Sequence, residues 1–180
     1  MTVDAKGIFS GMRTSLFLFV ILLAMCSEAY SGPSITDVKF YNAIEVNKIK
    51  QPEKLISDSI SRNNVGKLYA RFVIIGTADT IRHLEESGYL SVKLEWSHNN
   101  KVLDSIEVGI SQEKWELGEN ELKRQVEEQG FFSYRTYSFR SYIPAGTYKV
   151  TVRDGSGNIL SPQAFEGPGI YQPTLEVKGR

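Results

Sequence analysis

Apolar and polar residues alternate along much of the chain, and this period of two predicts β-strands. Residues 88–96 show it most clearly, with apolar side chains at every second position from Leu90 to Trp96. A polar stretch, 98–101, follows, and residues 102–110 then continue with apolar residues mainly on one side. Two such runs joined by a short polar turn predict a β-hairpin.

Three further segments carry strand patterns. Residues 67–77 are rich in β-branched and aromatic residues, apolar on both faces around 72–75, which is typical of a central strand. Residues 131–142 form an aromatic strand that ends before Pro144, and 35–46 form a weaker candidate. Residues 146–160 predict a hairpin around the turn Asp154-Gly155-Ser156-Gly157, because its two glycines can adopt positive φ.

The remaining segments lack a strand period. Residues 47–66 are polar and contain Pro52 and Gly66, so we expect a long connection, with one helical turn as an option. Residues 119–129 predict a short, exposed helix inside an insertion at 111–130. The stretch 166–180 holds two prolines and two internal glycines, and it predicts an irregular tail or at most an edge strand.

About seven strands without βαβ alternation or an internal repeat predict an all-β fold. We expect an antiparallel, immunoglobulin-like β-sandwich that forms a single domain over residues 30–180, with its core at about 35–165.

The first residues resemble an export signal rather than part of the fold. Ser15–Cys26 is an unbroken apolar run after Arg13, and it is shorter than the about 20 residues that a bilayer span requires. Small residues then favour cleavage between Ala29 and Tyr30, with a cut just before Gly32 as the alternative. The expected location is therefore periplasmic or secreted, with residues 1–29 as the signal peptide.

Three alternatives for this segment stay open, and one of them is an uncleaved membrane anchor, which the shortness of the apolar run disfavours. Cys26 ends a Leu-Leu-Ala-Met-Cys run that resembles a lipoprotein acylation site, although Met25 stands where such sites have a small residue. Translation could also start at Met12 instead of Met1, since Met12 directly precedes the positive flank of the signal.

Composition removes several classes of function. The chain has 21 basic and 21 acidic residues and one cysteine, Cys26, which leaves with a cleaved signal. The mature protein then has no thiol for disulfides, catalysis or metal binding. Balanced charge argues against nucleic acid as a partner, and membrane contact is expected only through the signal or an acyl chain.

The order of short motifs resembles an uncharacterised family of bacterial domains found in exported or membrane-anchored proteins. The motifs are Ala43-Ile44-Glu45, Pro52, Leu68–Phe72, Trp96, Lys101-Val102, Arg135–Ser138, Gly146–Val150 and Asp154–Leu160. Tyrosines stand at 137 and 148 where the family tends to have tryptophan, and 111–130 is an insertion. The resemblance implies a β-sandwich and brings no catalytic residue.

Candidate chemistry is sparse. His83 and His98 fall in contexts that predict solvated loops, and neither has metal-ligand spacing from another histidine. No serine lies in a Gly-x-Ser-x-Gly elbow, and the adjacent pairs Glu85-Glu86 and Glu127-Glu128 are typical of solvated loops rather than of glycosidase acid–base pairs. We therefore expect no catalytic residue, no metal and no cofactor.

The aromatic strand is the one segment with binding character. Its alternation places Phe131, Arg135, Tyr137 and Phe139 on one face and Phe132, Tyr134 and Arg140 on the other. Such residues either fill a sandwich core or remain at the surface for a sugar or a protein. The candidate binding surface is Trp115, Tyr134, Arg135, Tyr137 and Tyr142.

The sequence thus predicts an exported, non-catalytic module that binds a protein or a cell-envelope component. A carbohydrate-binding module or weak glycan hydrolase is one alternative, and a purely structural envelope subunit is the other.

Overall fold

The computed structural model describes residues 32–43, 45–46, 49–50, 54–163, 165 and 169–179. The predicted signal, including Cys26, Ala29, Tyr30 and both candidate start residues, lies outside the described residues.

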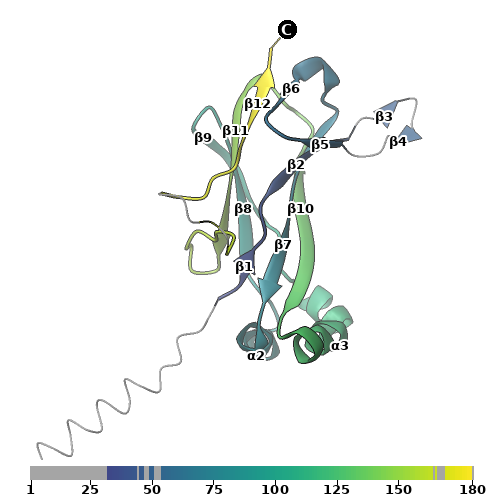
Figure 1. The fold of residues 1–180 in the computed structure, drawn as a ribbon, viewed down its shortest axis with the longest axis vertical. Helices are drawn as coiled ribbons and strands as arrows, with labels where there is room; N and C mark the ends of the chain where they lie inside the picture. Colours follow the sequence, from purple (N-terminus) through teal and green to yellow (C-terminus); the bar gives the residue numbers. More distant parts are fainter. Residues whose placement is uncertain are drawn as a thin grey trace, which may run out of the picture. The chain divides into compact units, whose positions relative to one another are not determined.

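The first sheet is built around the central strand β7 (Lys67–Gly76). Strand β10 (Phe132–Arg140) pairs with one side of β7 over its whole length. Strands β1 (Ser34–Ile35) and β2 (Lys39–Ala43) follow one another along the other side, and β5 (Lys54–Ile56) pairs with β2. All of these pairings are antiparallel, and the central position predicted for residues 67–77 is confirmed (Figure 1).

The second sheet has the order β6 (Ser59–Ser61), β12 (Thr174–Lys178), β11 (Gly146–Asp154), β8 (Val92–His98) and β9 (Lys101–Glu107). The β6–β12 pair is parallel, and the other pairs are antiparallel. Two short strands, β3 (Glu45–Val46) and β4 (Ile49–Lys50), form a separate two-stranded sheet.

One hydrophobic core joins the two five-stranded sheets. Trp96 of the second sheet is fully buried, and its ring centroid lies 6.2 Å from that of Phe40 in the first. The indole Nε1–H of Trp96 also donates to Ser138 Oγ at 3.0 Å, so a buried hydrogen bond links β8 with β10. A mostly β structure with two packed, largely antiparallel sheets agrees with the predicted sandwich.

The predicted hairpin at 98–101 is confirmed. Asn99 and Asn100 connect β8 to β9 with φ values of 49° and 64°, as a two-residue turn between twisted strands requires. The sequence pattern predicted that the apolar side of β9 is buried, but several of its apolar residues are partly exposed. Val102 is 54% exposed and Ile106 36%, because β9 lies at the sheet edge and its pairing shifts register between Trp96 and Ser97.

The second predicted hairpin is confirmed only at its turn. Asp154 and Asn158 are joined by a backbone hydrogen bond around the glycines, as expected. The returning chain, however, forms no named strand: it pairs with β11 through an isolated bridge between Arg153 and Ile159.

The helices differ from the prediction. Helix α2 (Ala78–Ser87) was not predicted, although the Thr77 N–H donates to Thr80 Oγ1 at 3.2 Å at its start and Gly88 ends the helix at φ 75°. Helix α3 (Gln112–Gln129) begins well before residue 119, because the hydroxyl of Ser111 caps it. It is also not simply exposed, since an apolar stripe packs against the core. The two buried residues of this stripe are Trp115 and Leu122.

Two expectations about connecting segments were wrong. Part of 47–66 forms β4, β5 and β6, and the one helical turn is a short 3₁₀ segment at Arg62–Asn64. The supposed tail contains β12, which is an interior strand of the second sheet with Leu175 and Val177 buried. The two prolines and the two internal glycines that suggested a tail precede this strand and are not part of it.

Candidate binding surface

Alternation along β7 divides its side chains between the core and the outer face of the first sheet. Leu68, Ala70 and Phe72 are buried, whereas Lys67 is exposed and the other outer residues are partly exposed. These outer residues include Tyr69 and Arg71.

The strand register extends this outer face across three strands. Tyr69 of β7 is paired with Tyr41 of β2 on one side and with Phe139 of β10 on the other. One step along, Arg71 lies between Lys39 and Tyr137. We call this surface the aromatic–cationic face, and it consists of Lys39, Tyr41, Lys67, Tyr69, Arg71, Arg135, Tyr137 and Phe139.

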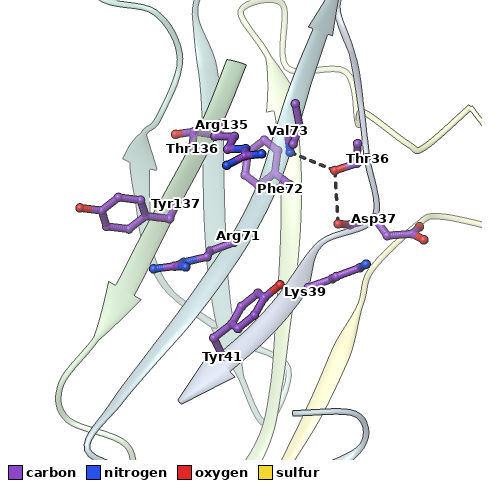
Figure 2. Close-up of a pocket in the computed structure, with 10 residues that line it drawn as sticks. All are labelled: Thr36, Asp37, Lys39, Tyr41, Arg71, Phe72, Val73, Arg135, Thr136 and Tyr137. Atoms are coloured by element: carbon purple, nitrogen blue, oxygen red, sulfur yellow. Dashed lines mark hydrogen bonds between the residues drawn. The ribbon is translucent and has the colours of Figure 1, made fainter. Parts of the chain in front are cut away.

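Arg71 is the centre of the aromatic–cationic face. Its guanidinium carbon lies 5.2 Å from the ring centroids of Tyr41 and Tyr69 and 5.7 Å from that of Tyr137. Figure 2 shows the Arg71 side chain between Tyr137 and Tyr41. These distances are typical of cation–π contacts, so the rings hold the guanidinium in place at the surface.

The rings also contact one another. The centroid of Tyr69 lies 5.8 Å from that of Tyr137 and 5.5 Å from that of Phe139, within the usual range for aromatic pairs. Lys67 Nζ is 5.0 Å from the centroid of Phe139. Tyr137 and Phe139 nevertheless remain 55% and 45% exposed, so much of their area is available for a ligand.

A hollow of about 630 Å³ opens on this face (Figure 2). Lys39, Arg71 and Arg135 contribute positive charge to its lining, and Tyr41 and Tyr137 contribute ring edges or faces. Asp37 is the single carboxylate among the lining residues, and it accepts a hydrogen bond from the Tyr171 hydroxyl at 3.4 Å. A concave surface of this composition suits an anionic group beside an apolar one.

The charge of the first sheet is strongly one-sided. Its five strands contain no Asp or Glu but contain Lys39, Lys54, Lys67, Arg71, Arg135 and Arg140. Arg140 pairs with Asp104 of β9 at 2.6 Å. Within the described part of the chain, Lys39, Lys67 and Arg135 form no salt bridge. The balanced total charge therefore conceals a locally basic surface.

The predicted surface residues separate into three locations. Arg135 and Tyr137 lie on the aromatic–cationic face. Tyr134 is half-buried on the opposite side of β10, with Lys114 Nζ 5.8 Å from its ring, and Tyr142 is 75% exposed beyond the end of the strand. Trp115 is only 6% exposed, so its assignment to a binding surface was wrong: α3 turns its ring into the core.

The contributions of β2 and β7 to this face were not predicted from the sequence. Tyr41, Tyr69 and Arg71 reach the same surface as β10 only through strand pairing. A signal existed in residues 67–72, where Lys67, Tyr69 and Arg71 alternate with apolar residues. The apolar run that follows on both faces suggested a strand buried on both sides and obscured this alternation.

The two histidines lie in regular elements, which corrects the expectation of loops. His83 lies in α2, and His98 ends β8, where its Nε2 is 3.1 Å from Ala145 O and its ring is 4.8 Å from that of Tyr148. Glu85-Glu86 and Glu127-Glu128 likewise lie on α2 and α3 rather than in loops. Among the described residues, no three His, Cys, Asp or Glu side chains cluster to hold a metal ion.

Two tyrosines away from the aromatic–cationic face have altered acidity. Burial raises the pKa of Tyr148, whose hydroxyl donates to Pro144 O at 3.0 Å. Burial also raises the pKa of Tyr171, whose hydroxyl accepts from the Val38 N–H at 2.9 Å. Both groups help to hold the fold together.

No protein-family model matches this chain, and no curated protein matches it. In the residues that the structure describes, neither helix combines the length and apolar character needed to cross a membrane.

Proposed function

We propose that this protein is an exported, non-catalytic β-sandwich module that binds an acidic partner protein through the aromatic–cationic face. The observation that carries the proposal is the register that brings four aromatic rings and four cations onto one sheet surface. In this part of the chain, three of the four cations form no salt bridge with a described residue.

The residue types support a protein as the partner. Tyrosine and arginine are enriched in protein interfaces and dominate their energetic hot spots, because both combine large apolar area with polar recognition. Arg71 is held among three tyrosine rings, so little side-chain freedom is lost when a ligand binds it. Lys39, Lys67 and Arg135, which form no salt bridge with a described residue, would steer an acidic partner toward the surface.

The cellular part of the proposal rests on the sequence. The short apolar run before Ala29 favours a cleaved signal and hence a periplasmic or secreted protein, with acylation at Cys26 as the alternative. The immunoglobulin-like class and the resemblance to exported bacterial domains are also part of this proposal. The burial of Trp96 between two sheets supports the first of these.

One observation favours a second candidate, an acidic polysaccharide. Tyr41, Tyr69 and Phe139 are in register across three neighbouring strands, and a row of rings suits the stacking of successive sugar units. Cations beside the rings would then pair with carboxylates on the sugars.

Binding to defined acidic polymers tests both candidates. The probes are poly-glutamate, polygalacturonate and neutral dextran, and the variants are the double charge reversals Lys39→Glu/Arg135→Glu and, as the matched control, Lys93→Glu/Lys149→Glu. The control residues lie on strands β8 and β11 of the second sheet. We expect poly-glutamate to bind the protein and the control variant, and the first variant to bind at least tenfold more weakly.

Any other outcome would change or overturn the proposed partner or surface. Selective binding of polygalacturonate would replace the protein partner by a glycan. Equal losses in both double variants would show only general charge attraction and would overturn the proposed surface. Binding of dextran alone would exclude an acidic ligand.

A further inference from the structure

Strand β10 has a free edge. Its pairing with β7 occupies one side, and no strand in the described ranges pairs with the other. The Thr36 N–H donates to Val73 O, and the Val73 N–H donates to Thr36 Oγ1, so the backbone of Val73 points away from β10. Arg135, the partner of Val73, therefore points its own N–H and C=O away from β7.

Alternation extends this orientation along β10. The backbone groups of Tyr137 and Phe139 face the free edge for the same reason as those of Arg135. The Ser133 N–H, one step before them, shows the same direction, since it donates to Gln125 Oε1 of α3 at 2.9 Å. Helix α3 thus occupies the edge position at Ser133 but not the edge positions at Arg135, Tyr137 and Phe139.

The neighbouring edge of the second sheet differs. Strand β9 carries a register shift, and charged residues occur at its two ends and at Asp104, which are features that discourage pairing with a further strand. Strand β10 is in continuous register with β7 from Phe132 to Arg140 and contains no proline. Of these two edges, that of β10 is therefore the one suited to receive a strand.

A hollow of about 620 Å³ follows this edge. Residues of both faces of β10 line it, Tyr134 and Thr136 from the inner face and Arg135 and Tyr137 from the outer face. A hollow that contacts both faces of one strand lies alongside that strand, where the next strand of the sheet would lie. Its opposite wall includes Ile106 and Val108, which gives it an apolar side toward the core.

The charged side chains that line this hollow and can still bind a ligand are positive. Lys114 and Arg135 line it, and neither forms a salt bridge with a residue that the structure describes. The carboxylate of Glu107 also lines it but is already occupied. It accepts from the Val92 N–H at 2.8 Å, the Gly109 N–H at 3.3 Å and the Ser91 hydroxyl at 3.1 Å.

We infer that the free edge of β10 binds an extended segment of a partner protein as an additional strand, with apolar and acidic side chains in alternation. The backbone of Arg135, Tyr137 and Phe139 supplies the ladder hydrogen bonds. Apolar side chains of the segment enter the hollow against Ile106 and Val108, and acidic ones lie beside Arg135. The inference stands apart from the proposed function, because it rests on the strand edge rather than on the outer face.

The test compares two substitutions of one residue. Tyr137→Ala removes the ring and keeps the edge N–H, whereas Tyr137→Pro removes both, and the N–H lost does not belong to the ladder with β7. The probe is a synthetic peptide of alternating valine and glutamate, labelled for fluorescence anisotropy. Its controls are an N-methylated copy and a peptide with the same residues in separate blocks.

We expect the alternating peptide to bind the protein and the Tyr137→Ala variant, and to bind Tyr137→Pro at least tenfold more weakly than Tyr137→Ala. Neither control peptide should bind comparably. Hydrogen exchange gives an independent readout: the amides of Arg135, Tyr137 and Phe139 should become protected when the peptide binds. This readout uses the unmodified protein and decides the question if Tyr137→Pro does not fold.

Equal binding to the two variants, equal binding of the N-methylated copy, or no protection of these amides would overturn the inference. A dimer of the protein alone that Tyr137→Pro dissociates would also overturn it, because the occupant would be a second copy. Binding of poly-glutamate is measured separately, with Lys39→Glu. The two measurements therefore distinguish a failure of the proposed aromatic–cationic face from a failure of strand addition at the edge of β10.

Discussion

The outer faces of the two sheets differ although both cover the same core. On the first sheet, cations stand among aromatic rings without acidic residues in the strands. On the second sheet, charges of both signs are interspersed: Lys93 is paired across strands with Glu107, and Arg153 Nε lies 3.6 Å from Glu95 Oε2. Part of that face is also covered, since Thr151 is buried and receives a hydrogen bond from Gln172.

This difference shows why total charge is a poor guide to binding. A face on which opposite charges already neighbour one another gains little from an acidic ligand, because the ligand must compete with existing partners. A face with exposed rings, on which three cations form no salt bridge with a described residue, gains both attraction and apolar contact. The contrast between the faces, rather than the composition of the chain, locates the candidate site.

The largest effect is expected from Trp96, which belongs to the second sheet and packs against the first. Trp96→Ala should reduce the free energy of unfolding by about 3–5 kcal/mol, because it removes a fully buried ring from between them. Urea unfolding followed by circular dichroism measures the loss. A single transition is expected, and two separate transitions would contradict a common core.

Loss of the buried link between the sheets should have a smaller effect. Ser138→Ala leaves the Trp96 indole N–H without its partner, which should lower the free energy of unfolding by about 1–3 kcal/mol. Ser141→Ala is the matched control, since Ser141 is exposed just beyond the same strand. Equal stability of the two variants would show that the hydrogen bond contributes nothing.

Neutralising one arginine on each face compares the faces directly. Arg71→Met keeps a long apolar side chain but removes the cation among three rings, and we expect a loss of about 1–2 kcal/mol in unfolding free energy. Arg153→Met disrupts a surface pair with Glu95, which should change stability by about 0–1 kcal/mol. Thermal unfolding of both variants measures the difference, and a larger loss for Arg153→Met would reverse the comparison.

Local pattern accounted for the elements that alternation defines. Strand β8 and the turn at Asn99-Asn100 follow from sequence alone, because a period of two and residues that tolerate positive φ are local properties. The interior position of strand β12 was not predicted, because it depends on pairing with β6 and β11, which are separate segments of the sequence.

The candidate site shows the same limit. Arg135 and Tyr137 were predicted from β10, but Tyr41 and Arg71 join them only through the register of three strands. Trp115 was misplaced because the apolar stripe of α3 begins earlier than the pattern from Leu122 onward indicates. Which aromatic residues share a surface is thus a property of the sheet and not of any one segment.

The most direct test of the account is a nuclear magnetic resonance titration of the protein with poly-glutamate at low salt. If the aromatic–cationic face binds acidic ligands, the largest amide shifts fall on β2, β7 and β10, centred on Arg71, and they fade at physiological ionic strength. Shifts centred on Lys93 and Lys149 of the second sheet, or spread evenly over both sheets, would contradict it.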